Sequence, residues 1–254
     1  MSGFFRGLFG DPARSGLAGD APAREAPPLP EMIRVLHGLT DDQWGLYAFS
    51  REALKGRFST GERLQMAAES AACGRAEAAR LRETHGPLPP LEYARRMGLK
   101  VEFPDRPIGG SFVIFAQFSP PDQVRVFRDA LDKAGALLAE YPGLPVQSVE
   151  QVSDVLLAHE LFHRVEEERR DQLYTRTKRV ELWKLGPLKN ASPVSCLSEI
   201  AGMAFAKELC GLDWSPYLLD VLLVYGYNAG AAANLYQGIL RVAGTDSTEK
   251  RQPT

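Results

Sequence analysis

Residues 148–168 read SVEQVSDVLLAHELFHRVEEE, and this stretch sets the interpretation of the whole chain. Ser148 followed by Gln151 is typical of a helix N-terminus, because the serine hydroxyl can accept a hydrogen bond from the third backbone N–H. Apolar residues at helical spacing then supply a packing face, namely Val152, Val155 and Leu156. The stretch therefore predicts a long amphipathic helix with a polar end at the three glutamates 166–168.

This helix carries two of the four histidines in the chain, His159 and His163, with Glu160 between them. Residues four apart lie on one face of an α-helix, so both imidazoles can bind the same ion. Zinc accepts two imidazoles readily, and the intervening Glu can reach a water on the metal. The spacing predicts a zinc site with Glu160 as general base. The alternative is a pair of surface histidines on an amphipathic helix.

A catalytic zinc needs a third protein ligand, which this helix cannot supply from its remaining positions. Glu199 is the favoured candidate, because it lies near the start of the next predicted helix, which extends from Ser192-Pro193 to Gly211. Burying that carboxylate among apolar neighbours is costly without a cation. Glu208 and Glu181 are weaker candidates, and Glu199 could instead be favoured there by the helix dipole. Small residues that let two helices approach closely follow it, at positions 201, 202, 204 and 206.

The remaining elements predict an α+β fold, helix-rich with a small three-stranded sheet. Thr40 with Gln43 fits a capping box that opens one helix, and Ser215-Pro216 opens a final apolar helix through residue 240. Further helices are predicted over residues 62–82, 91–97 and 129–140, and strands over 99–103, 111–118 and 123–127. Residues 120–122 form the turn between the last two strands.

We expect residues 1–30 to be a disordered tail, 31–244 a single domain and 245–254 a flexible tail. Within the domain, residues 31–90 form a helical N-terminal extension and 91–211 the metal-binding core. Residues 171–191 bridge the two metal-bearing helices as a basic segment, which is either a solvated connector or a selector of acidic partners.

Composition excludes several classes of protein. Hydrophobic residues make up 44% of 254, which is enough for a buried core, and the net charge of −2 gives no basic field for nucleic acid. No apolar run reaches the roughly 20 residues of a transmembrane segment. Three widely spaced cysteines, Cys73, Cys196 and Cys210, suit a reducing compartment, so a cytoplasmic location is expected. A faint helix-turn-helix pattern over residues 67–82 is discounted, because its glutamates would oppose phosphates.

Two stretches together resemble the ImmA/IrrE-like zinc metallopeptidases: HELFH at 159–163 and SEIAGMAFAKEL at 198–209. EYARRMGLKV at 92–101 looks like the helix-to-strand entry of the same fold. The resemblance covers roughly residues 90–210 and implies a zincin-like metallopeptidase domain with Glu199 as the third ligand. The chain departs from the family in two ways: Gly202-Met203 stands where Ala-Asn is common, and the interval from His163 to Glu199 is longer.

These observations predict a zinc-dependent metallopeptidase that cleaves a peptide bond in a protein or peptide substrate, such as a regulatory protein. Glu160 would take the proton from the zinc-activated water. The alternatives are a metal-binding regulatory protein without proteolytic activity, hydrolysis of another amide, and Mn²⁺ or Fe²⁺ in place of zinc. Strand 111–118 could pair with an extended substrate. The oxyanion donor is not assigned among four tyrosines, Tyr174, Tyr217, Tyr225 and Tyr227.

Overall fold

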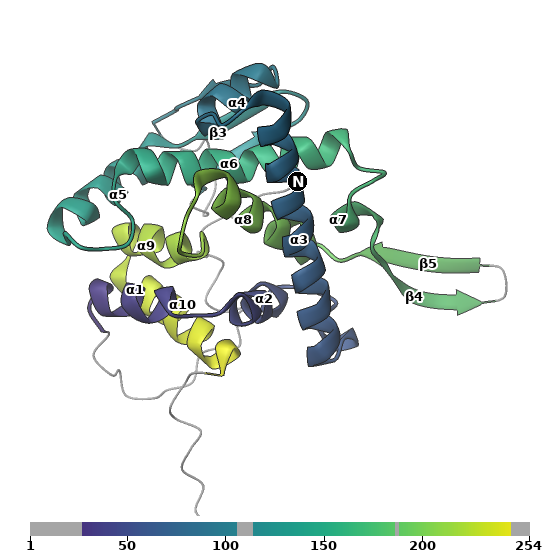
Figure 1. Cartoon of the computed structure of the whole chain (residues 1–254). Helices are drawn as coiled ribbons and strands as arrows, with labels where there is room; N and C mark the ends of the chain where they lie inside the picture. Colours follow the sequence, from purple (N-terminus) through teal and green to yellow (C-terminus); the bar gives the residue numbers. More distant parts are fainter. Residues whose placement is uncertain (1–26, 106–113, 186–187, 245–254) are drawn as a thin grey trace, which may run out of the picture.

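The computed structural model describes residues 27–105, 114–185 and 188–244, and it confirms a helix-rich α+β architecture with a small three-stranded sheet. The long helix α6 (Val149–Glu168) crosses the body (Figure 1). The small sheet and helix α4 (Pro90–Arg96) pack on one side of α6, and helix α8 (Cys196–Cys210) packs on another. Ser148 caps α6 as predicted, because its hydroxyl accepts the backbone N–H of Gln151 at 3.2 Å.

The N-terminal part of the described chain consists of helices. Thr40 and Gln43 form the predicted capping box, and Ser59 and Glu62 form a second one. Residues 1–26 of the predicted tail, and the predicted tail 245–254, lie outside the described residues. Leu29, which was also assigned to the tail, begins a helix and is fully buried. The elements are α1 (Leu29–His37), α2 (Asp41–Ser50), the 3-10 turn η1 (Lys55–Arg57) and α3 (Thr60–His85).

The small sheet has the strand order β1-β3-β2, with β1 parallel and β2 antiparallel to β3. The three strands are shorter than predicted, and residues 111–113 of the expected second strand lie outside the described residues. Gly98 ends α4 with a φ of 70°, which a glycine adopts without strain. The strands are β1 (Lys100–Glu102), β2 (Ala116–Ser119) and β3 (Gln123–Val126), and α5 (Arg128–Glu140) follows them.

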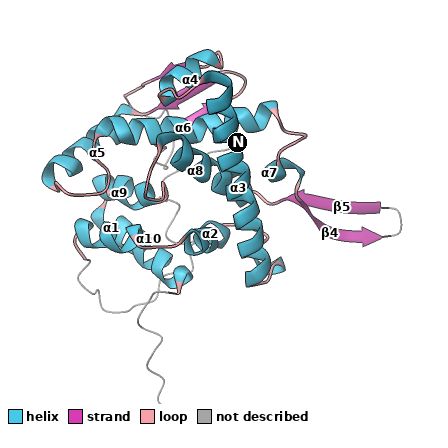
Figure 2. Ribbon diagram, in the orientation of Figure 1, coloured by secondary structure: helices cyan, strands magenta, loops and turns pink. Residues whose placement is uncertain are grey.

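Between α6 and α8 the chain forms a short helix and a hairpin, where the sequence analysis expected a connector. These elements are α7 (Tyr174–Thr177), β4 (Arg179–Leu185) and β5 (Leu188–Pro193). The antiparallel pair β4-β5 projects from the body (Figures 1 and 2). Trp183 on β4 is 52% exposed.

The predicted start of α8 at Ser192-Pro193 is wrong. Pro193 ends β5, where it pairs with Arg179, and the helix begins at Cys196. The capping acceptor comes from a distant part of the chain: Glu52 accepts the backbone N–H of Cys196 at 3.0 Å and the hydroxyl of Ser195 at 2.8 Å. The predicted end at Gly211 is confirmed, with a φ of 64°.

The predicted single helix after Ser215-Pro216 is two helices, α9 (Leu218–Tyr227) and α10 (Ala229–Ala243). Asn228 separates them, because its extended backbone ends α9 and its side chain caps α10 by accepting the N–H of Ala231 at 2.8 Å. Ser215-Pro216 precedes α9 without capping it, since that helix begins at Leu218. In the described part of the chain, no helix is both long enough and apolar enough to cross a bilayer.

Candidate metal centre

Helices α6 and α8 bring His159, His163 and Glu199 together, as the sequence analysis predicted. The histidines face α8 from the middle of α6, and Glu199 lies in the first turn of α8. The two histidine Nε2 atoms are 3.1 Å apart. Glu199 Oε2 lies 3.3 Å from Nε2 of His159 and 3.9 Å from Nε2 of His163. Two histidines from one helix and a glutamate 36 positions further along the chain thus direct three donor atoms at one place.

The spacing of these donors fits a tetrahedral ion. Bonds of about 2.0–2.1 Å to a central zinc, at tetrahedral angles, separate two donors by roughly 3.3 Å. The observed separations of 3.1, 3.3 and 3.9 Å bracket this value. Two imidazoles and one carboxylate are also the donor set of many catalytic zinc sites. The cluster can therefore hold a metal ion with little movement of the side chains.

The absence of a side chain at Gly202 makes this approach possible. A Cβ built at Gly202 would lie 2.9 Å from both Cε1 and Nδ1 of His159, closer than such atoms pack. Phe162 and Phe205 close the same helix interface, with ring centroids 5.7 Å apart. The close approach of His159 is therefore a physical reason for a glycine at position 202.

Glu166 supports His163 from the next turn of α6. Its carboxylate lies 3.8 Å from Nδ1 of His163 and accepts hydrogen bonds from Ser198 Oγ at 2.8 Å and Thr175 Oγ1 at 2.5 Å. Burial disfavours the charged imidazole, but the adjacent carboxylate of Glu166 and the charges of Glu199 and Glu160 outweigh this effect and raise the pKa of His163 to about 9. The surrounding carboxylates therefore favour a positive charge at this place.

Glu160 is fully buried beside the two histidines. Its Oε2 accepts the backbone N–H of Phe118, in β2, at 2.6 Å. Its Oε1 has no hydrogen-bond partner among the residues that the structure describes. Burial raises the pKa of Glu160, although the charges of His163 and His159 oppose this effect. One carboxylate oxygen is thus fixed by the sheet, and the other is left for a proton or a water.

The centre is nearly closed to solvent. His159 is 0% exposed, His163 2% and Glu199 8%. The weaker ligand candidates lie elsewhere: Glu208 pairs with Arg82 at 3.2 Å, and Glu181 belongs to the projecting strand β4. Neither belongs to the cluster of donor atoms, which the described residues form with Glu199 alone as third member.

The four tyrosines proposed as oxyanion donors have different surroundings. Burial raises the pKa of Tyr217, and the charge of Glu199 adds to this effect. Lys178 Nζ lies 5.9 Å from the ring centroid of Tyr174, and the ring of Tyr227 packs against Phe115. The role of oxyanion donor therefore stays unassigned among the four tyrosines.

Two buried acids near the centre were not identified from the sequence. Glu166 was assigned to the polar end of the helix, although its spacing of three from His163 was a usable signal. Asp220, in the apolar run of α9, accepts the hydroxyl of Tyr47 at 2.8 Å and pairs with Arg51 at 3.4 Å. Burial raises the pKa of Asp220, and the charges of Arg51 and His159 oppose it. A lone carboxylate within an apolar run could have indicated this partner.

Comparison with known proteins gives no match. No family model fits the chain, and neither a curated protein nor a solved structure is similar to it. The resemblance to the ImmA/IrrE-like family therefore stays a prediction from the residues at 159–163, 198–209 and 92–101.

Proposed function

We propose that the protein is a zinc-dependent metallopeptidase, in which His159, His163 and Glu199 hold the ion and Glu160 is the general base. The observation that carries this proposal is the placement of Glu160: its Oε2 is fixed by the Phe118 N–H, beside three donors whose separations suit zinc. A structural zinc site needs four protein ligands and no neighbouring base. Three donors and a buried carboxylate are the set that hydrolysis needs.

A zinc ion held by these donors would supply Lewis acidity, which lowers the pKa of a water at its open position. The residues of the chain do the rest. Oε1 of Glu160 accepts the proton of the attacking water and then passes it to the leaving amine nitrogen. Water thus adds across the amide, so the products are a carboxylic acid and an amine. Glu166 would keep His163 oriented, because its carboxylate faces Nδ1, the ring nitrogen that is not part of the donor cluster.

Strand β2 is the proposed substrate strand. Gln117 and Ser119 alternate with Ala116 and Phe118, and the N–H of Phe118 points to Glu160. The main-chain groups of Ala116 and Phe118 therefore lie on the edge of β2 that β3 does not use. An extended peptide could pair with the groups of that edge other than the Phe118 N–H, which Glu160 occupies, and bring its carbonyl beside Glu160. A protein or peptide substrate, such as a regulatory protein, is accordingly proposed.

Elemental analysis of the full chain, combined with a peptidase assay, tests the proposal. We expect one zinc per chain, retained in the control His37→Ala, an exposed histidine on α1, and lost in His159→Ala. Fluorescein-labelled casein and a randomised peptide library, read by mass spectrometry, serve as substrates. Glu160→Gln should keep the zinc and reduce cleavage by about 10²–10⁴-fold. Absence of any stoichiometric metal after reconstitution, or full cleavage by Glu160→Gln, contradicts the proposal.

The second candidate function is a metal-binding regulatory protein without proteolytic activity. The near-complete burial of His159, His163 and Glu160 favours it, because a substrate carbonyl must reach the ion. This function predicts a zinc that EDTA removes only slowly and no cleavage of casein or of the peptide library. Rapid metal exchange together with cleavage would reject it.

A further inference from the structure

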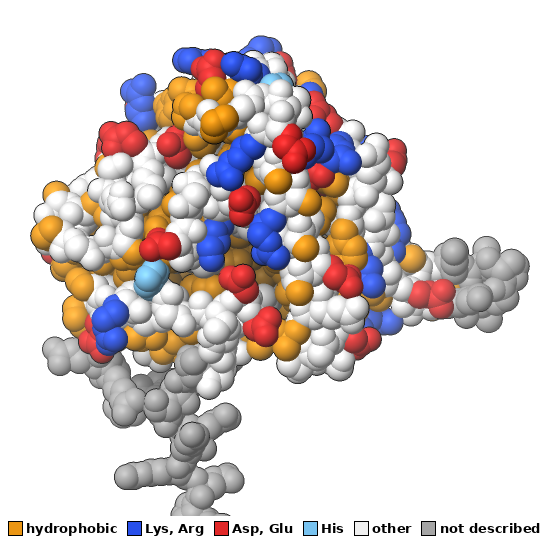
Figure 3. Space-filling model, in the orientation of Figure 1, with side chains coloured by type: hydrophobic (Ala, Val, Ile, Leu, Met, Phe, Trp, Pro, Cys, Tyr) orange, Lys and Arg blue, Asp and Glu red, His pale blue; other side chains and the backbone are white. Residues whose placement is uncertain are grey.

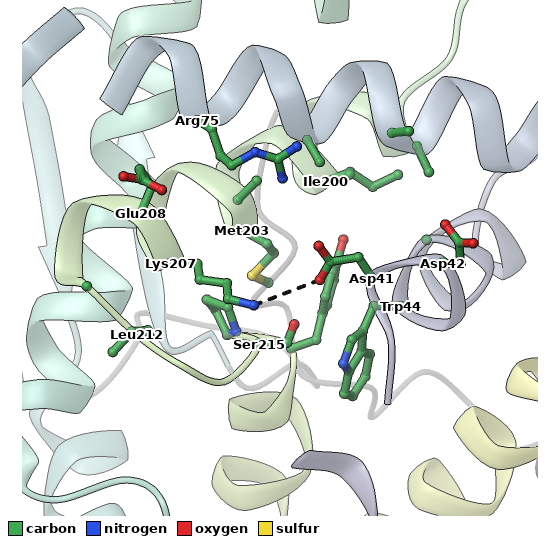
Figure 4. Close-up of a pocket in the computed structure, with 18 of the residues that line it drawn as sticks. Asp41, Asp42, Trp44, Arg75, Ile200, Met203, Lys207, Glu208, Leu212 and Ser215 are labelled. Atoms are coloured by element: carbon green, nitrogen blue, oxygen red, sulfur yellow. Dashed lines mark ion pairs between the residues drawn. The ribbon is translucent and has the colours of Figure 1, made fainter. Parts of the chain in front are cut away.

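A hollow of about 660 Å³ lies in the described part of the body, bounded by α2, α3, α8 and the segment that leads into α9 (Figures 3 and 4). Ile200, Met203, Ala204 and Lys207 line it from α8. The metal donors use a different face of the same helix, where Gly202 meets His159. The hollow is therefore separate from the candidate metal centre, and no step of the proposed hydrolysis uses it.

The floor of the hollow is apolar. Trp44 and Tyr217 lie side by side there, with ring centroids 5.5 Å apart and planes at 17°. Met203 and Ile200 continue the floor along α8 (Figure 4). The opposite wall is made by a helix face of small side chains, which leave the space unfilled: Ala67, Ala68 and Ala71 of α3. In Figure 3, a recessed patch of hydrophobic side chains is surrounded by charged ones.

Two cations face each other across this floor. Arg75 extends from α3 over Ile200, and Lys207 extends from α8 (Figure 4). Arg75 is exposed and has no hydrogen bond or ion pair with another described residue. Lys207 has only a long ion pair, 3.9 Å, with Asp41. Arg82, by contrast, is engaged by the carboxylate of Glu208 and by the main-chain oxygen of Leu209.

The acidic side chains at the hollow do not neutralise the positive charge of both Arg75 and Lys207. Asp41 is the partner of Lys207, and Glu208 is the partner of Arg82. Asp42 lies beyond Asp41, at the far end from Arg75 in Figure 4. It belongs to the first turn of α2, where the helix dipole favours an acid. The unneutralised charge over the middle of the floor is therefore that of the Arg75 guanidinium.

We propose that this hollow binds a small apolar molecule that carries one carboxylate. The apolar body would lie on Trp44, Tyr217 and Met203, and the carboxylate would receive paired hydrogen bonds from Arg75, with Lys207 as the second cation. A volume of about 660 Å³ falls within the range of sites for drug-sized ligands, which are mostly apolar with a few polar groups that fix orientation. Lys207 can turn to the ligand because its pair with Asp41 is long.

Calorimetric titration of the full chain tests this site, with two carboxylates and their neutral counterparts as probes. Decanoate and 2-naphthoate supply an aliphatic and an aromatic acid, and 1-decanol and 2-naphthylmethanol supply the same bodies without charge. We expect at least one acid to bind, at least about tenfold more tightly than its alcohol. Zinc content is measured on the same samples and should not change, which separates this result from the proposed hydrolysis.

Three variants locate the binding. Arg75→Gln should weaken binding of the acid about tenfold or more and leave the alcohol unaffected. Ala68→Phe fills the hollow from an exposed helix position, so it should weaken both probes. Arg34→Gln removes an exposed arginine of α1 outside the hollow and should change neither. Absence of binding by both acids, equal binding of acids and alcohols, or unchanged binding in Arg75→Gln would each overturn the proposal.

Discussion

The two faces of helix α8 differ in what small residues accomplish. On the face toward α6, Gly202 lets the ring of His159 come within contact distance, so the space is filled and the donors are buried. On the face toward α3, the small residue Ala204 and the opposing Ala68 leave a hollow. The same residue sizes thus produce a closed polar centre on one side and an open apolar site on the other. The difference comes from the neighbouring helix: α6 places the large ring of His159 against its face of α8, whereas α3 places alanines against the other.

The charges on the two faces differ in the same way. Glu199 lies with other buried carboxylates, Glu160 and Glu166, so this face favours a bound cation. The hollow has its ionic groups at the rim, where Arg75 is exposed to solvent. Buried charges need a partner to offset desolvation, whereas rim charges do not. The first face is therefore expected to depend on a metal, and the second face is expected to fold without its ligand.

The largest change in stability is expected from a substitution at Gly74, where the backbone of α3 packs directly against the backbone of α8. A Cβ at this position would overlap the carbonyl group of Ala201, which is main chain and cannot move alone. We expect Gly74→Ala to lower the free energy of unfolding by about 3 kcal/mol, measured in urea, because the two helices must separate.

Gly238→Ala is the matched control, since a Cβ at Gly238 meets nothing within 4 Å on helix α10. This control should stabilise the protein by about 0.5–1 kcal/mol through the lost flexibility of glycine. Equal effects of the two substitutions would show that α3 and α8 do not meet as described, and both faces of α8 would then need a different account.

A smaller effect, confined to one face, is expected from Gly202→Ala. The added methyl group would displace the ring of His159, from which it would lie 2.9 Å, and so move Nε2 away from Glu199. We expect zinc affinity to fall by about 10- to 100-fold, the range seen when the support of a metal ligand is lost. Competition with a fluorescent chelator measures this affinity.

Ala204→Ser places a change of similar size on the hollow face of α8. Its zinc affinity should equal that of the wild type, because Ala204 does not face the donors. If both variants lost zinc equally, the two faces would be coupled through α8 and not independent.

Local patterns in the sequence predicted that His159, His163 and Glu199 would come together. The spacing of His159 and His163 depends only on helix geometry, and the capping signal at Ser148 fixed the helix that carries them. Glu199 was found because a carboxylate among small apolar residues on a helix needs a partner. In each case the sequence signal lies within one helix or at its start, where spacing along the chain is informative.

The start of α8, the hairpin and the hollow could not be predicted, because they depend on residues that are distant in the sequence. Ser192-Pro193 has the local form of a helix start, yet strand pairing with β4 takes Pro193, and Glu52 supplies the cap 144 positions away from Cys196. The hairpin β4-β5 is held mainly by pairing between its own strands, which no local pattern in the sequence indicated. Asn228 divides a continuous apolar run, which periodicity alone reads as one helix. The hollow is the space between α8, α2 and the small side chains of α3. The sequence of α8 alone could not predict it.

The smallest effect is expected at Glu52, and it should reach both faces of α8. Glu52 holds the N-terminus of this helix, on which both faces depend. Its carboxylate accepts the backbone N–H of Leu54 at 3.0 Å, the N–H of Cys196 at 3.0 Å and the hydroxyl of Ser195 at 2.8 Å. In Glu52→Gln a neutral amide replaces the charged acceptor. We expect a loss of about 1–2 kcal/mol in the free energy of unfolding at pH 7, and small decreases in both zinc and decanoate affinity.

The pH dependence of this loss identifies its cause. Burial acts to raise the pKa of Glu52, but the hydrogen bonds to its carboxylate outweigh burial and lower that pKa below the usual 4.5. A carboxyl group whose pKa is lower in the folded chain contributes stability above its unfolded pKa and loses it as the pH falls through the folded value. Unfolding in urea with EDTA present should therefore show the full difference between wild type and Glu52→Gln at pH 7 and at pH 6. The difference should shrink below about pH 4, as the folded carboxyl group is protonated. A difference that stays constant down to pH 3 would mean that the carboxylate charge does not hold the helix start, and that α8 keeps both faces in place by packing alone.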